Sequence, residues 1–287
     1  MFDRISNGFS LARSSWDVLI KDKHLILFPI ISGVLFLIVV VSFAIPLGTL
    51  VDWNQVHQHM QNNNNKPPVW VYPVTFVFYF CCYFVIIFCN SALVSCALLR
   101  FNGQEPSLGD GFRAAFARLP QIFAWALVSA SVGLLLKAIE NAHEKVGYYI
   151  SMILGTAWSV MTFFVVPVLV VEKVGPIAAV SRSMSLLSKT WGEALVGKLG
   201  LGLFLFLLAI PVFLLFVGGI AALVAGMVPV GVALLIAGGI AMLLHSAISA
   251  ALHTILLAAL YQYASQGSVA PGFDQHTFEC AFTRQAA

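Results

Sequence analysis

The sequence predicts an all-α membrane protein, a helix bundle with six transmembrane helices. Of its 287 residues, 60% are hydrophobic and only 9% are charged, which is too little charge to cover a water-soluble domain. Its apolar segments reach the roughly 20 residues that a helix needs to cross a hydrocarbon core of about 30 Å. These segments follow one another almost without interruption, so we expect a single membrane domain over residues 1–287.

Charged or turn-forming residues separate the predicted spans. The uncharged tract from Leu199 to Phe273 is long enough for two helices. Gly226 and Pro229 mark the turn between them, because glycine permits unusual backbone angles and proline cannot continue a helix. The six predicted spans cover about 25–51, 69–99, 119–139, 146–171, 199–225 and 229–263.

The basic residues predict the orientation of the chain. Twelve of the 15 Lys and Arg residues fall on one side of the predicted spans, which leaves Lys66, Lys137 and Lys145 on the other side. Basic residues in short loops are retained on the cytoplasmic side of a membrane. We therefore expect a multi-pass protein of the bacterial cytoplasmic (inner) membrane, with both termini in the cytoplasm.

Three basic amphipathic segments, at about 3–22, 107–118 and 176–191, each precede a pair of spans. Their apolar residues recur at helical spacing, while Arg, Lys and Ser fill the other face. Such helices lie in the membrane interface, with basic side chains near anionic headgroups. The predicted architecture is therefore three hairpins, each preceded by a cytoplasmic interfacial helix. A threefold duplication is one interpretation, and the general tendency of loops between membrane helices to be basic and amphipathic is the other.

The segment from Asp52 to Pro68 is polar and rich in asparagine. Because such a run has little to bury, we expect a mobile loop on the outer side. His57 and His59 are spaced i, i+2 in this segment, but no third metal ligand is near them in the sequence. We therefore expect both histidines to be solvated.

Two stretches resemble a known protein family. The first is Ser14-Ser15-Trp16 to Lys21-Asp22-Lys23, followed by Leu27-Phe28-Pro29, and the second runs from Pro167 to Pro176 and on to Ser181-Arg182-Ser183. Both are similar to segments of an uncharacterised family of bacterial integral membrane proteins, known as a domain of unknown function. The resemblance implies a membrane location for most of the chain. It implies no reaction, so no catalytic residue follows from it.

A candidate intramembrane polar site is formed by His245, Ser249 and His253. They are spaced i, i+4 and i+8, so they share one face of the sixth span. Ionisable side chains at membrane depth are costly, which makes each a functional candidate. The trio would suit a proton relay or a polar substrate path. Neutral imidazoles that bond a neighbouring helix would show the same spacing.

Charged residues next to the predicted inner membrane surface are candidates for lipid headgroup binding or for structural ion pairs. Glu172 stands at the end of the fourth span, where an ion pair with Arg182 or Lys198 would hold an interfacial helix against the bundle. We favour this structural role over a gating or ligand role. The full set of candidates comprises Arg113, Arg118, Glu172, Arg182, Lys189 and Lys198.

Small residues mark places where helices can approach closely. Cys82, Cys89 and Cys96 recur every seven residues along one stripe of the second span, which favours packing. Pro211 predicts a kink in the fifth span. The same span contains several glycines that indicate close contact or flexibility: Gly197, Gly200, Gly202, Gly218 and Gly219.

No segment resembles a phosphate-binding loop, a nucleophile elbow or a metalloprotease helix. We therefore expect no enzymatic activity, no cofactor and no metal site. The net charge of +3 is small and dispersed, which argues against nucleic acid. The favoured function is binding of membrane lipids, of a protein partner or of a second copy in a homo-oligomer through the basic interfacial helices. A small-solute transporter or channel, with a polar path near His245 and His253, is the alternative, and a lipid-modifying enzyme is the third class.

Overall fold

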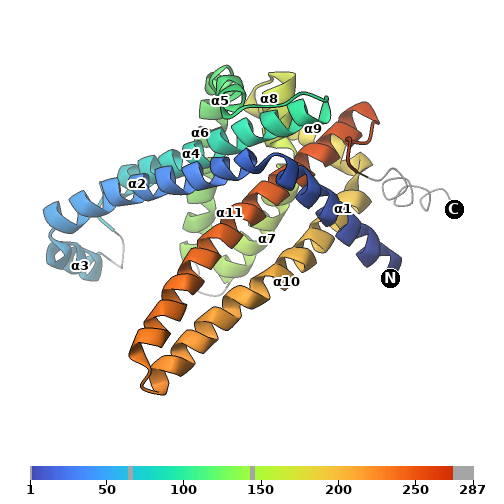
Figure 1. Cartoon of the computed structure of the whole chain (residues 1–287). Helices are drawn as coiled ribbons and strands as arrows, with labels where there is room; N and C mark the ends of the chain where they lie inside the picture. Colours follow the sequence, from blue (N-terminus) through green and yellow to red (C-terminus); the bar gives the residue numbers. More distant parts are fainter. Residues whose placement is uncertain (1, 64–66, 143–145, 274–287) are drawn as a thin grey trace. The chain divides into compact units, whose positions relative to one another are not determined.

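The computed structural model describes residues 2–63, 67–142 and 146–273, and these residues form helices without any strand. Figure 1 shows the helices in chain order. Their bounds are α1 Phe2–Lys21, the 3₁₀ helix η1 Lys23–Ile26, α2 Leu27–Leu50, α3 Trp53–Asn62, α4 Val71–Phe101, α5 Leu108–Phe116, α6 Leu119–Ala142, α7 Val146–Met161, α8 Val165–Glu172, α9 Pro176–Lys189, α10 Trp191–Val224 and α11 Val228–Gln266.

Six stretches of the described residues are long and apolar enough to cross a membrane, in agreement with the six that the sequence predicts. The first of them, over α2, exposes apolar side chains around most of its circumference, as a helix in contact with lipid would. The six stretches are Lys23–Leu50, Val71–Phe101, Leu119–Asn141, Val146–Glu172, Gly197–Val224 and Val228–Gln266.

The fourth stretch agrees with the predicted span over about 146–171, but it is broken into α7 and α8, which the sequence analysis does not predict. Pro167 gives the physical reason. Proline has no N–H group, and its ring clashes with the carbonyl four residues earlier, here that of Phe163. A new helix that begins at Val165 places Pro167 in its first turn, where backbone N–H groups have no helical partner in any case.

The segment after α2 differs from the prediction, because Trp53–Asn62 forms the helix α3 rather than a mobile loop. Asp52 caps this helix: its Oδ1 accepts hydrogen bonds from the second and third backbone N–H groups, at 3.0 and 3.4 Å. Val56 is buried on one side of the helix. The remaining asparagines of the run, at 64–65, lie outside the described residues.

The described residues group into two compact units, each of which we describe by itself. The first unit draws on Met1–Ile30, Leu93–Gly111 and Ser185–Ala287, and the second on Ile31–Ala92 and Phe112–Met184. Four helices, α2, α4, α5 and α9, contribute residues to both units. The expectation of a single membrane domain stays a prediction.

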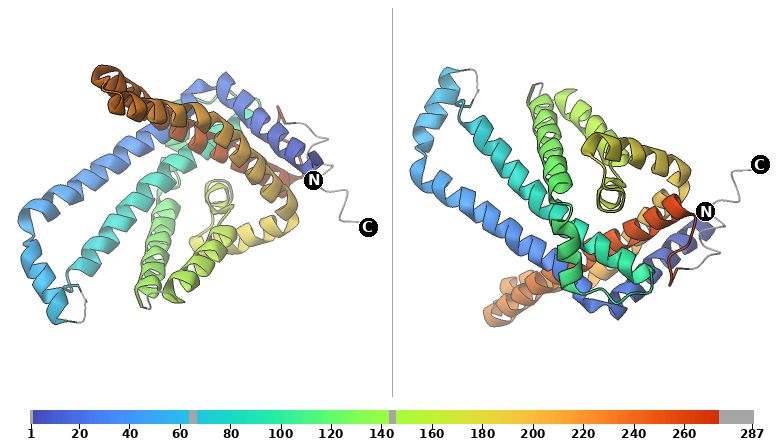
Figure 2. Two further views of the ribbon diagram at one scale, coloured as in Figure 1. Left: turned by 90° about the horizontal axis from the view of Figure 1, so that it is seen from below. Right: turned by 90° about the horizontal axis from the view of Figure 1, so that it is seen from above.

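In the first unit, α10 and α11 lie side by side (Figure 1, Figure 2). Gly226 turns the chain between them with a φ of +79°, at the place where the sequence predicts the turn. Glycines allow the two helices to approach closely. A Cβ atom on Gly219 would lie 2.9 Å from the side chain of Leu235, and one on Gly231 would lie 2.6 Å from that of Leu223.

Helix α1 contacts the N-terminal part of α10. Gly8 of α1 and Gly200 of α10 touch through their backbones, with no room for a Cβ atom on Gly200. Beyond this contact along both helices, the rings of Phe9 and Trp16 meet the ring of Phe204 edge to face, with centroids 5.5 and 5.9 Å apart. The glycine contact and the aromatic contacts together hold α1 against α10.

The C-terminal half of α11 is the best-buried part of the first unit. The helix has 39 residues, which corresponds to a length of about 58 Å at 1.5 Å per residue. Its buried side chains concentrate in 251–262, and α1 packs against α11 as well as against α10. Side chains of this core include Leu11, Leu19, Leu25, Leu252, Ile255, Leu260 and Tyr261.

Polar contacts join the end of α4 to η1 and to the start of α5 within the first unit. The Nε of Arg100 lies 3.0 Å from Oδ2 of Asp22. Ser107 and Asp110 form a reciprocal capping box, because Asp110 Oδ2 accepts from the N–H and hydroxyl of Ser107 while Ser107 Oγ accepts from the N–H of Asp110. The thiol of Cys96 donates to the carbonyl of Ser107 at 3.5 Å. These contacts fix the connection between α4 and α5.

The second unit contains α6 and α7 as packed neighbours. The rings of Trp125 and Trp158 stack between them with centroids 5.7 Å apart. In the same unit, Phe80, Phe84 and Phe88 follow one another along α4 at i, i+4 spacing. Further phenylalanines of α5 and α6 pack on this row: Phe112, Phe116 and Phe123.

Candidate functional site

The charged candidates Glu172 and Arg182 come together within the second unit, where α8 is followed by α9. Glu172 is the last residue of α8, and Lys173 ends that helix with a φ of +59°. Pro176 then begins α9, where its fixed φ suits a first helical position. This reversal of the chain carries Arg182 back to Glu172.

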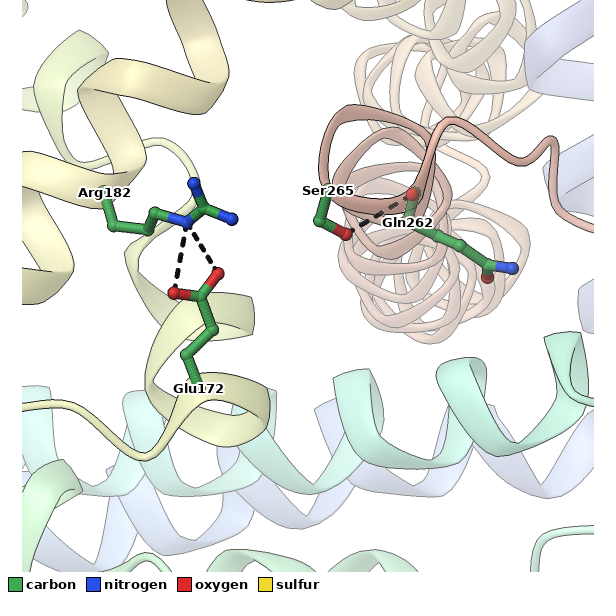
Figure 3. Close-up of polar contacts among 4 residues, drawn as sticks. All are labelled: Glu172, Arg182, Gln262 and Ser265. Atoms are coloured by element: carbon green, nitrogen blue, oxygen red, sulfur yellow. Dashed lines mark hydrogen bonds and ion pairs between the residues drawn. The ribbon is translucent and has the colours of Figure 1, made fainter.

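Figure 3 shows the resulting ion pair. The Nε of Arg182 lies 2.8 Å from Oε1 and 3.1 Å from Oε2 of Glu172. The sequence analysis predicts an ion pair of Glu172 with Arg182 or Lys198, and the pair with Arg182 is confirmed. Both side chains are partly exposed, so the pair contributes about 1 kcal/mol or less to stability. The main effect of the pair is to fix the position of α9, and its contribution to stability is small.

Arg118, a third candidate, lies between α5 and α6 and reaches the C-terminal end of α8. Its Nε donates to the carbonyl of Val170 at 3.0 Å, and its Nη1 donates to the carbonyl of Ala117 at 3.1 Å. The last carbonyls of a helix lack helical partners and carry partial negative charge, which a guanidinium satisfies. Arg118 therefore has a structural role in this unit.

Ser183, the residue after Arg182, makes a contact that the sequence analysis did not predict. Its Oγ accepts a hydrogen bond from the backbone N–H of Phe164 at 2.9 Å, and both residues are fully buried. Phe164 lies at the break between α7 and α8, where its N–H takes no part in the helical hydrogen-bond pattern. We call Arg118, Glu172, Arg182 and Ser183 the polar clasp, because together they hold α8, α9 and the α5–α6 junction.

The other basic candidates, Arg113, Lys189 and Lys198, have exposed side chains. Within the described residues, no ion pair engages any of the three. Arg113 lies on α5 close to Phe116, whose side chain is 62% exposed, whereas Ala115 on the opposite side is fully buried. These three cations are therefore available to a ligand from outside the chain.

The polar face of the sixth span is partly exposed. His245 and Ser249 are half-buried and His253 is exposed. The Nδ1 of His253 lies 2.9 Å from the backbone carbonyl of Ser249, one helical turn earlier. The trio occupies successive turns of α11, as predicted, and the contact of His253 stays within its own helix.

His57 and His59 of α3 are exposed, as expected. His59 also lines a pocket of about 380 Å³ together with Asp52, Gln55 and Trp70. Among the described residues, no group of three or more His, Cys, Asp and Glu side chains gathers that could hold a metal ion.

Comparison with known families decides where the chain belongs. The model of the Family of unknown function (DUF6159) matches residues 69–272, which is more than half of the chain. The chain belongs to DUF6159. This confirms the resemblance to an uncharacterised family. No curated protein and no solved structure gives a significant match to this DUF6159 chain.

The region that matches DUF6159 contains most of the candidate residues. It includes the whole polar clasp, the exposed cations Arg113, Lys189 and Lys198, and the histidine face of α11. Helices α1 and α2 precede it. The description of DUF6159 assigns no reaction, so the function of these residues must be argued from their chemistry.

Proposed function

We propose that this protein is a non-enzymatic, multi-pass membrane protein that binds anionic phospholipid headgroups through exposed basic residues. The observation that carries the proposal is the pairing of Arg113 with Phe116 on α5. Both side chains are exposed, and Phe116 is 62% exposed. Exposure of such an apolar ring to water would be energetically unfavourable. At a membrane surface the ring would enter the acyl boundary while the guanidinium reaches a phosphate.

The same combination recurs on α10. On α9 the exposed Lys189 and the 88% exposed Ile177 lie at opposite ends of the helix and do not form it. On α10, the exposed Lys198 is followed directly by the exposed Leu199. A long basic side chain next to an apolar one suits the boundary between headgroups and acyl chains. Two helices, α5 and α10, therefore support the lipid proposal independently.

The topology that goes with this function has both termini in the cytoplasm of a bacterium and its spans in the inner membrane. In it, α1, α5 and α9 are interfacial helices that precede three hairpins. The basic residues support this arrangement, because Arg113, Lys189 and Lys198 would all face the anionic cytoplasmic leaflet. The side-by-side packing of α6 with α7 and of α10 with α11 supports two of the hairpins.

Replacing Arg113, Lys189 and Lys198 together by glutamine is expected to reduce binding of phosphatidylglycerol. Each basic residue near an anionic surface contributes about 1 kcal/mol, or roughly fivefold in affinity. The triple variant should therefore lose roughly a hundredfold if the contributions add. Native mass spectrometry of the purified protein, with phosphatidylglycerol titrated into the detergent, would measure this loss.

Lys137→Gln is the matched control for this experiment. Lys137 is exposed and pairs with Glu140 at 3.2 Å, and it lies on the predicted outer side. Its substitution should leave phosphatidylglycerol binding unchanged. Arg118 and Arg182 are left intact because they belong to the polar clasp. Equal binding by the triple variant and the wild type would contradict the proposal, as would turnover of a labelled lipid extract by the purified protein.

The histidine face of α11 gives the transport alternative no specific support. The bond of His253 Nδ1 to the Ser249 carbonyl lies within one helix, and a purely structural histidine would form it equally well. This contact therefore does not favour transport over lipid binding.

A further inference from the structure

A polar pocket of about 670 Å³ lies in the first unit, apart from the basic residues of the proposed function. It is formed where α1 ends, η1 follows and α4 meets the start of α5. The side chains that give it chemical character are Lys21, Asp22, His24, Arg100, Glu105 and Ser107.

The pocket lies at the level where two spans end. One apolar stretch begins at Lys23 and another ends at Phe101, so the lining residues Asp22 and Arg100 are next to the ends of both. The first turn of α2, which follows His24 of the pocket closely in the chain, exposes Leu27 and Ile30. A molecule with a polar head in the pocket would thus find apolar surface directly beside it, which is the layout of a phospholipid rather than of a free ion.

The pocket contains hydrogen-bond donors that the described part of the chain leaves unused. The Nε2 of His24 is buried without a partner, which is costly for a polar atom unless something outside the chain satisfies it. Arg100 uses its Nε for Asp22, and its two terminal nitrogens form no hydrogen bond with the described residues. Lys21 is exposed at the rim. These donors suit an oxyanion such as a phosphodiester.

The charges of the pocket favour a ligand that carries both signs. Lys21 and Arg100 are balanced by Asp22 and Glu105, so a simple anion would gain little net attraction. The carboxylate of Glu105 is exposed, and no salt bridge engages it within the described residues. An ammonium group would find its counter-charge there.

We propose that this pocket binds the headgroup of a zwitterionic phospholipid with a free amine, such as phosphatidylethanolamine. Lys21, His24 and the terminal nitrogens of Arg100 hold the phosphodiester, Glu105 holds the ammonium, and the acyl chains lie along Leu27 and Ile30. The inference rests on the membrane location in the proposed function. It uses a different set of residues and a different class of lipid.

Lys21→Gln tests the phosphate side of the pocket, with Lys23→Gln as its matched control. Both lysines are exposed and lie two residues apart, but only Lys21 lines the pocket. Native mass spectrometry with dioleoyl phosphatidylethanolamine should show about fivefold weaker binding for Lys21→Gln and unchanged binding for Lys23→Gln. Equal behaviour of the two variants would overturn the site.

Glu105→Gln tests the amine side. The wild type should prefer phosphatidylethanolamine to phosphatidylcholine, whose quaternary amine has no N–H to donate, and Glu105→Gln should abolish that preference. Two further results would refute the proposal: no preference in the wild type, or displacement of the lipid by millimolar inorganic phosphate, which would indicate a free-phosphate site. Unchanged phosphatidylglycerol binding in the Arg113, Lys189 and Lys198 variant would contradict the proposed function alone, so the two failures are distinguishable.

Discussion

Gly200→Ala is expected to lower the free energy of unfolding by about 3 kcal/mol, the upper end of the usual cost of overpacking. The added methyl group would collide with the backbone of Gly8. Because a backbone cannot rotate away as a side chain can, α1 must shift as a whole. Such a shift would also disturb the contacts of Phe9 and Trp16 with Phe204. Thermal unfolding in detergent micelles, followed by tryptophan fluorescence, would report the loss as a lower Tm.

Gly202→Ala is the matched control, two residues further along the same helix. A Cβ atom on Gly202 would meet nothing within 4 Å. Alanine should therefore leave the Tm unchanged or raise it, because it is a better helix former than glycine by up to about 1 kcal/mol. If the two substitutions lowered the Tm equally, the close contact between α1 and α10 would not exist in the protein.

Ser183→Ala should have the second-largest effect, a loss of about 1–3 kcal/mol in the free energy of unfolding. The substitution removes the Oγ that accepts from the N–H of Phe164, so a buried backbone donor loses this hydrogen bond. The side chain of alanine otherwise fits the site, so steric strain does not contribute. Chemical denaturation in mixed micelles would measure the change.

Ser181→Ala provides the comparison, since Ser181 lies on the exposed side of the same helix. Its substitution should be neutral within about 0.5 kcal/mol. Ser183→Thr is a useful third variant because it retains the hydroxyl and so should retain part of the stability. Neutral behaviour of Ser183→Ala would mean that the break between α7 and α8 does not depend on this bond.

The sequence could predict the features that follow from the cost of placing charges and unpaired backbone groups in lipid. Charge-free tracts of sufficient length indicate the six spans, and Gly226 with Pro229 indicates the turn between α10 and α11. The pair of Glu172 with Arg182 was also accessible, because Gly175 and Pro176 must reverse the chain between them. Each of these inferences depends on residues that are close in sequence.

Other features were visible in the sequence but were not recognised. Pro167 should have indicated that a helix could not run unbroken through the fourth span. Asp52 before Trp53 is an N-cap signal for α3, and Ser107 with Asp110 has the spacing of a capping box. The start of α5 agrees with the amphipathic helix predicted at about 107–118, whereas α3 and the break in the fourth span depend on local backbone chemistry that hydropathy does not show.

A third group of features could not have been predicted, because the partners are far apart in the sequence. Asp22 and Arg100 are separated by two predicted spans, and nothing in either segment indicates the other. Gly200 was marked as a site of close contact, but the sequence does not show that its neighbour is Gly8. The pocket beside His24 likewise exists only because η1 and the end of α4 meet in space.

The length of α10 and α11 affects how the protein would respond to bilayers of different thickness. From Leu199 to Phe273 no Asp, Glu, Lys or Arg interrupts the chain, and each helix exceeds the roughly 20 residues that a bilayer requires. Hydrophobic mismatch would therefore be accommodated by tilting rather than by exposing polar groups to acyl chains. Neither helix carries a charge within this tract that would fix its depth in the bilayer. Helix α1 packs on both, so α1 would limit how deeply α10 and α11 insert.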